Sequence, residues 1–141
     1  NRIYGPAGFL QYQFAVPNAA AHLVTRTLEA LRQVGAPSFL TVLKRFGPSN
    51  QAPLSFPMPG WTLAADVPAA VPGLLDVLEK LDEDVLKAGG RLYLAKDSRQ
   101  SSVMMSASHS RLQEWLVSAS RLNPKETFAS CMASRYSLVS R

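Results

Sequence analysis

The chain has 141 residues, of which 47% are hydrophobic, and its mean hydropathy is close to zero. This composition supports one or two small cores and excludes a largely disordered chain. No apolar run approaches the roughly 20 residues that span a bilayer. The single cysteine, Cys131, excludes an intramolecular disulfide. With only two histidines beside it, no spacing resembles a zinc site, so we expect no bound metal.

The net charge of +5 is unevenly distributed along the chain. Residues 1–90 hold seven Lys or Arg and seven Asp or Glu, whereas residues 91–141 hold eight against three. An excess of positive charge suits an anionic partner, which is a nucleotide cofactor, a lipid phosphate or a nucleic acid. The basic residues are dispersed with few aromatic residues between them, so a nucleic acid is the least favoured partner and we expect none.

The first predicted strand covers residues 9–16 and has one apolar and one polar face. Leu10, Tyr12 and Phe14 alternate with Gln11 and Gln13. The two glutamines are either solvated or present their amides to a ligand, and the pattern alone does not choose between these alternatives.

Helical spacing of apolar residues predicts helices over residues 19–34 and 73–88. Asn18 is a good N-cap for the first helix and Gly35 ends it, while Gly89 ends the second. Further strands are predicted over residues 38–46, 61–67 and 91–95.

The segment between the second and third strands, residues 47–60, contains four prolines together with apolar side chains. This composition predicts an ordered loop, and ordered loops of this length are usually functional. Immediately before it, Lys44 shares a predicted face with Leu40 and Val42. Lys44 points either toward whatever this face covers or outward at the strand edge.

The predicted order is β-α-β-β-α-β, which is typical of an α+β fold with an antiparallel, ferredoxin-like sheet and both helices on one face. The second face of such a sheet is free for a partner. Beyond residue 99, a Ser-rich stretch, a helix over 111–121 and a helical tail after Asn123 predict a C-terminal helical arm. This arm has too little apolar surface for its own core, so we expect it to dock on another domain.

Residues 89–99, with the sequence GGRLYLAKDSR, place several charges directly after the last predicted strand. Lys96 is expected at the end of this strand, a common place for a ligand-binding cation. The alternative is a solvated turn.

Three segments together resemble a known flavoprotein family. They are residues 46–61 (FGPSNQAPLSFPMPGW), residues 89–99 and residues 123–130 (NPKETFAS). In this order they resemble the C-terminal part of the FAD-dependent decaprenylphosphoryl-ribose 2-oxidases, members of the vanillyl-alcohol-oxidase-like superfamily. The resemblance covers nearly the whole chain.

This resemblance implies a division of the chain into two parts. Residues 1–90 correspond to the end of a substrate-binding domain, and residues 91–141 to the return of the chain into an FAD-binding domain. Most of that FAD-binding domain is expected upstream of Asn1, so the fragment alone is expected to be inactive. The implied cofactor is FAD.

The resemblance also implies roles for individual residues. Lys96 matches a lysine beside the flavin and the substrate and is the expected catalytic residue, with Tyr93 as a second cofactor-binding residue. The implied substrate-binding residues are Gln11, Gln13, Lys44, Phe46, Trp61 and Tyr93. In one departure, Ala64 stands where the best-known members of the family carry a cysteine, which leaves the exact substrate open.

The implied reaction is oxidation of the 2-hydroxyl of a polyprenyl-phosphoribose to a 2-keto sugar, for the synthesis of cell-wall arabinan precursors. The implied partners are the lipid-linked sugar, the FAD-binding domain and a reductase that completes an epimerisation. The implied location is the periphery of the bacterial cell membrane. The residues alone leave an alternative, a non-catalytic ferredoxin-like module that binds an anionic ligand or a partner protein.

Overall fold

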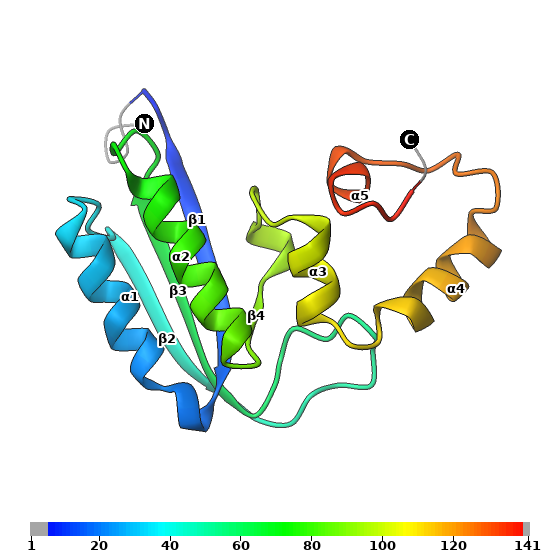
Figure 1. Ribbon diagram of the computed structural model, residues 1–141, viewed down its shortest axis with the longest axis horizontal. Coiled ribbons are helices and arrows are strands. Elements are labelled where there is room, and N and C mark those ends of the chain that lie inside the picture. The colour runs from blue at the N-terminus through cyan, green and yellow to red at the C-terminus, as the bar shows by residue number, and fades with distance from the viewer. Residues whose placement is uncertain (1–5, 140–141) are drawn as a thin grey trace.

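The computed structural model describes residues 6–139, which form a four-stranded antiparallel sheet and five α-helices. The strands are β1 (Phe9–Pro17), β2 (Leu40–Phe46), β3 (Gly60–Pro68) and β4 (Arg91–Leu92), in the order β2-β3-β1-β4. Helices α1 (His22–Gln33) and α2 (Leu74–Lys87) both cover one face of the sheet (Figure 1). The predicted α+β fold with helices on one face is confirmed.

The two faces of the sheet follow from the alternation of side chains along its strands. Tyr12, Phe14 and Val16 of β1 are buried beneath the helices in the main core. Leu63 of β3 lies directly opposite Phe14 and belongs to the same core. Side chains at the intervening positions, including Gln11, must therefore lie on the face that carries no helix.

Both long helices are amphipathic, and their apolar stripes complete this core. Leu23 and Leu31 of α1 and Leu78 of α2 are almost completely buried, with exposed fractions between 0 and 4%. Burial of each such leucine stabilises the fold by about 2 kcal/mol. On the outer surface, the guanidinium of Arg26 in α1 forms an ion pair with Asp84 in α2 at 2.8 Å.

The last strand is shorter than the sequence predicts. Only Arg91 and Leu92 pair with β1, and Leu94–Lys96 then form a short 3-10 turn, η2. The amide of Lys96 donates to the carbonyl of Tyr93, which closes this turn. Lys96 therefore lies at the end of a turn, and the prediction that it lies at a strand end is wrong.

Three shorter helices follow and lie beyond β4 (Figure 1): α3 (Ser102–Ser108), α4 (Leu112–Leu122) and α5 (Cys131–Arg135). The sequence analysis did not predict α3, which begins where the hydroxyl of Ser101 accepts a hydrogen bond from the amide of Met104. A second 3-10 turn, η1 (Asn18–Ala20), precedes α1. No helix within residues 6–139 is both long and apolar enough to cross a membrane.

The arm has a small apolar cluster, although the sequence predicts no core there. Met105, Leu112 and Tyr136 are buried together, and Leu54 of the loop between β2 and β3 packs against them. The cluster therefore packs the helices of the arm against one another and against the loop.

Gly60, the first residue of β3, provides a direct test of how tightly β1 and β3 pack. A Cβ atom at this position would lie 1.9 Å from the carbonyl oxygen of Val16, and the φ angle of Gly60 is 156°. Neither the close approach nor this backbone conformation tolerates a side chain.

We expect Gly60→Ala to lower the free energy of unfolding by about 1–3 kcal/mol, because the two strands must separate to admit the methyl group. Gly47→Ala is the matched control, since a Cβ there meets no atom within 4 Å. Denaturant unfolding of both variants checks this expectation. Equal stability of the two variants would contradict the close packing of β1 against β3.

Candidate substrate face and cofactor-facing turn

Gln11 and Gln13 are held in place on the helix-free face of the sheet by hydrogen bonds to β3. The Nε2 of Gln11 donates to Asp66 Oδ1 at 3.0 Å, and the Nε2 of Gln13 donates to Thr62 Oγ1 at 3.2 Å. Both bonds use the amino group of the amide. Within residues 6–139, neither Oε1 atom accepts a hydrogen bond, so each can accept one from a ligand hydroxyl.

Strand β2 adds Lys44 and Phe46 to the same face. In the strand register, Lys44 lies opposite Thr62 and Phe46 lies opposite Gly60. Thr62 in turn lies opposite Ala15 of β1, on the same face as Gln13. Two strand spacings, about 10 Å, separate the backbones of β1 and β2. The face therefore presents an exposed ammonium beside two oriented amides.

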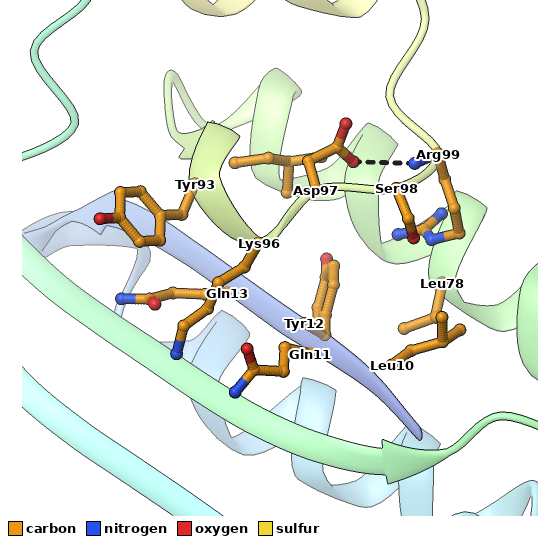
Figure 2. A pocket seen from close by; sticks show the side chains of 11 residues that line it. Leu10, Gln11, Tyr12, Gln13, Leu78, Tyr93, Lys96, Asp97, Ser98 and Arg99 are labelled. Atoms are coloured by element: carbon orange, nitrogen blue, oxygen red, sulfur yellow. Dashed lines mark hydrogen bonds between the residues drawn. The ribbon is translucent and has the colours of Figure 1, made fainter. Parts of the chain in front are cut away.

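Lys96 and Tyr93 reach this face from η2. The amide of Tyr93 donates to the carbonyl of Gln13 at 2.9 Å, which ties the turn to the edge of β1. Figure 2 shows the Lys96 side chain extending over β1, with its ammonium on the same side as the amides of Gln11 and Gln13. Within residues 6–139, no carboxylate forms an ion pair with Lys96.

Phe46 and Tyr93 are connected by a residue that the sequence analysis did not single out. The ring of Phe56 lies 4.5 Å from that of Tyr93 and 5.6 Å from that of Phe46, measured between centroids. The contact with Phe46 is edge-to-face at 89°. These three rings, which we call the aromatic wall, connect the end of β2 to η2. Phe56 lies in the segment 46–61, whose irregular sequence gives no periodic signal.

Trp61 is the one predicted site residue that does not lie with the others. It directly precedes Thr62 in β3, so its side chain lies on the helix-covered face. There it packs against the main core, and the guanidinium carbon of Arg45 lies 5.8 Å from its ring centroid. A direct role of Trp61 on the substrate face is therefore not supported by its position.

Asp97, next to Lys96, connects the turn to the C-terminal helix. Its Oδ1 accepts hydrogen bonds from the amides of Arg99 and Gln100, and its Oδ2 accepts from Arg135 and from the hydroxyl of Tyr136. Burial by itself raises the pKa of Asp97, but these hydrogen bonds outweigh it and hold the pKa below its ordinary value.

Arg99 connects the same turn to α2. Its guanidinium forms an ion pair at 2.9 Å with Asp82, which is 1% exposed, and lies over the ring of Tyr12. Burial raises the pKa of the Asp82 carboxyl, and the Arg99 guanidinium partly offsets this shift. Asp97 and Arg99 thus anchor the chain directly after Lys96.

The crevice between β1 and η2 is small (Figure 2). It is lined by residues that include Gln11, Gln13, Tyr93 and Lys96, yet it holds only about 10 Å³. This volume suits a single water molecule rather than a sugar. The candidate residues therefore form an open wall, which a ligand would cover from outside.

Ala64 lies on this wall, between Gln13 of β1 and Val42 of β2 in the register. It is 9% exposed and offers only a methyl group. The single thiol of the chain, Cys131, is exposed in α5. The position of Ala64 therefore offers no thiol.

We expect Asp97→Asn to lower the free energy of unfolding at pH 7 by about 3 kcal/mol, because it leaves Arg135 without a buried anionic partner. The carboxylate of Asp97 stabilises the fold fully above its unfolded pKa of 3.8, and this stabilisation is lost as the pH falls through the lower folded pKa. The stability gap between parent and variant should therefore narrow between about pH 5 and pH 2.

Denaturant unfolding at several pH values measures this gap. Asp76→Asn, which changes an exposed carboxylate in the first turn of α2, is the matched control. A gap that stays constant down to pH 2 would contradict the charge-assisted role of Asp97.

Comparison with known proteins identifies relatives that extend well beyond this chain. The chain is 47% identical over 139 residues to decaprenylphosphoryl-beta-D-ribose oxidase of Mycolicibacterium smegmatis, which is 99% of this chain and 30% of that protein. It is 33% identical over 131 residues to a Streptomyces coelicolor protein described as an uncharacterized protein in the mprA 5′ region, which is 93% of this chain and 36% of that protein. No family model matches the chain.

The chain thus spans about a third of the length of these curated relatives. The match to the oxidase covers 139 of the 141 residues and therefore includes the segments on which the resemblance rests. The expected resemblance is confirmed: the chain is similar over 99% of its length to part of a decaprenylphosphoryl-β-D-ribose oxidase.

Proposed function

We propose that the chain is part of an FAD-dependent oxidoreductase that oxidises the 2-hydroxyl of a polyprenyl-phosphoribose to a 2-keto sugar. The observation that carries this proposal is the gathering of Gln11, Gln13, Lys44 and Lys96 on one helix-free sheet face, in a chain 47% identical to such an oxidase. The amides and ammonium groups suit sugar hydroxyls and a phosphate.

The residues around η2 fit a flavin. Lys96 offers a cation without a carboxylate partner in the described chain, and the half-buried Tyr93 offers an aromatic ring with a phenol. A bound flavin would supply the hydride acceptor. Lys96 is the expected catalytic residue, since a preorganised cation stabilises negative charge that develops beside it or holds a substrate oxygen.

The remaining residues bind and orient the lipid-linked sugar. The Oε1 atoms of Gln11 and Gln13 accept from ribose hydroxyls, and Lys44 pairs with the phosphate. The aromatic wall covers the apolar part of the substrate and keeps water away from the sugar. Because the face is open, a second domain must close the site for the reaction to exclude water.

We assign residues 1–90 to the substrate-binding domain and residues 91–141 to the return into the FAD-binding domain. Large apolar side chains on the arm support this assignment, because Leu122 is 87% exposed and Phe128 is 81% exposed. An open hollow of about 720 Å³ lies beside them, between α4 and the C-terminal segment. Such surfaces suit a covering domain.

The cellular role follows from the substrate. A polyprenyl phosphate resides in a membrane, so we place the enzyme at the periphery of the bacterial cell membrane. The 2-keto product requires reduction to complete an epimerisation, which calls for a partner reductase. The product of the two steps would serve as a precursor of cell-wall arabinan.

The first test concerns the isolated chain. We expect the 141-residue chain not to retain FAD, because the open face of its sheet, with η2, forms only one side of a cofactor cleft. Titration of FAD, followed by isothermal calorimetry, checks this. Binding in the low micromolar range, about 8 kcal/mol, would show that the chain makes more of the cofactor site than proposed.

The second test concerns Lys96 in a complete flavoprotein that contains this chain. Lys96→Met should slow flavin reduction by the lipid-linked sugar about a hundred- to thousand-fold, because it removes one preorganised charge from a water-poor site. Lys80→Met, an exposed position in α2, is the matched control. Single-turnover bleaching of the flavin measures both rates. An unchanged rate in the Lys96→Met variant would contradict the catalytic role and favour the alternative, in which Lys96 is a solvated residue of a turn.

A further inference from the structure

The loop between β2 and β3, residues 47–59, is fastened from outside by two arginines of the C-terminal half. The Nη1 of Arg91 donates to the carbonyl oxygen of Ser55 at 2.5 Å, and the Nη1 of Arg111 donates to the carbonyl oxygen of Gln51 at 2.8 Å. Figure 1 shows the loop reaching from the end of β2 to α3 and the start of α4. The loop is therefore a bridge between the sheet and the arm.

The loop also holds its own shape. The hydroxyl of Ser55, a residue that is 6% exposed, accepts from the amide of Asn50 at 3.3 Å and donates to the carbonyl of Pro57 at 3.2 Å. Leu54, beside Ser55, packs into the apolar cluster of the arm. Ser55 is thus held by several hydrogen bonds, and Phe56 follows it directly in the chain.

Arg91 is well suited to hold Ser55. It is half-buried in β4, and its guanidinium donates a charge-assisted hydrogen bond, roughly twice as strong as a neutral one. The Arg91 guanidinium also interacts electrostatically with His109, which is 3% exposed. Burial and then the Arg91 guanidinium lower the pKa of His109, which favours its neutral imidazole.

Phe56 is the residue that this arrangement places on the substrate face. Its ring fills the space between Phe46 and Tyr93 in the aromatic wall. The wall is apolar except for the phenol of Tyr93, whereas the amides of Gln11 and Gln13 and the Lys96 ammonium gather over β1. This separation of apolar from polar groups matches a substrate whose polar head and apolar chain must be bound apart.

We propose that Arg91 is a positioning residue that holds the loop at Ser55 so that Phe56 contacts the apolar chain of the lipid-linked sugar. The proposal rests on the proposed function for the identity of the ligand. In this arrangement Phe56 determines specificity for the length of the prenyl chain, and Arg91 acts indirectly, through the backbone of the loop. Arg91 touches neither the sugar nor the flavin in this arrangement.

The positioning step is tested on the 141-residue chain by nuclear Overhauser effects between the rings of Phe56 and Tyr93. We expect these effects to disappear in Arg91→Met and to persist in Arg91→Lys, which retains a cationic donor. Arg26→Met, which breaks a surface ion pair far from the loop, is the matched control and should also retain them. Ring contacts that persist in a folded Arg91→Met variant would overturn the positioning role.

The specificity step is tested in the complete flavoprotein with two probes, phosphoribose carrying a decaprenyl chain and phosphoribose carrying a geranyl chain. Phe56→Ala should raise KM for the decaprenyl probe about tenfold, equivalent to about 1.4 kcal/mol, with little change for the geranyl probe and in kcat. Arg91→Met should give the same pattern, Arg91→Lys should restore the parent values, and the double variant should add nothing further.

The outcomes separate the two proposals. Equal KM changes for both probes, or a loss in kcat alone, would overturn the assignment of Phe56 to the apolar chain while leaving the oxidase function in place. A parent protein that oxidises neither probe would overturn the proposed function and, with it, the ligand assigned to Phe56. Should Arg91→Met fail to fold, Phe56→Ala and Arg91→Lys still decide the specificity step.

Discussion

The alternation of side chains along β1 is the constraint on which the rest of the structure depends. β1 pairs with β3 over its full length and with β4 on its other edge, so it lies inside the sheet. Burial of Phe14 and Val16 beneath the two helices fixes its register, because a slip of one residue would expose these side chains to water. The same register places Gln11 and Gln13 on the open face and orients their amides through β3.

The short length of β4 has the next largest consequence. The strand ends after Leu92, and the chain turns along the edge of β1 instead of continuing the sheet. This turn carries Tyr93 and Lys96 over the polar face. The hydrogen bonds of Asp97 with Arg135 and of Arg99 with Asp82 hold the turn in place. A cation on a flexible loop would reorganise when charge develops beside it, whereas an anchored one is already in place.

The fold was predictable from the sequence because its strands and helices follow regular apolar periods, and their bounds agree within one or two residues for β1, β3 and α2. The same alternation placed the two glutamines together on the polar face of β1 but left the direction of Lys44 open, and the strand register then brings Lys44 to the same face. Trp61 shows the limit of reasoning from resemblance, since a position one residue before Thr62 points to the helices and not to the open face. Phe56 was missed because its position depends on hydrogen bonds from the side chains of Arg91 and Arg111 to carbonyl oxygens of the loop. These partners are distant in the sequence, so no local pattern reveals them.

The central claim is that the open face of the sheet, from Lys44 to Lys96, is the substrate wall of a flavin-dependent oxidase. A crystal structure of a complete flavoprotein containing this chain, with a bound polyprenyl-phosphoribose analogue, tests this claim most directly. The account predicts the ribose within hydrogen-bond distance of Gln11 or Gln13 and of the Lys96 ammonium, with the prenyl chain along the aromatic wall. A sugar bound elsewhere, with this face covered by protein alone, would contradict it.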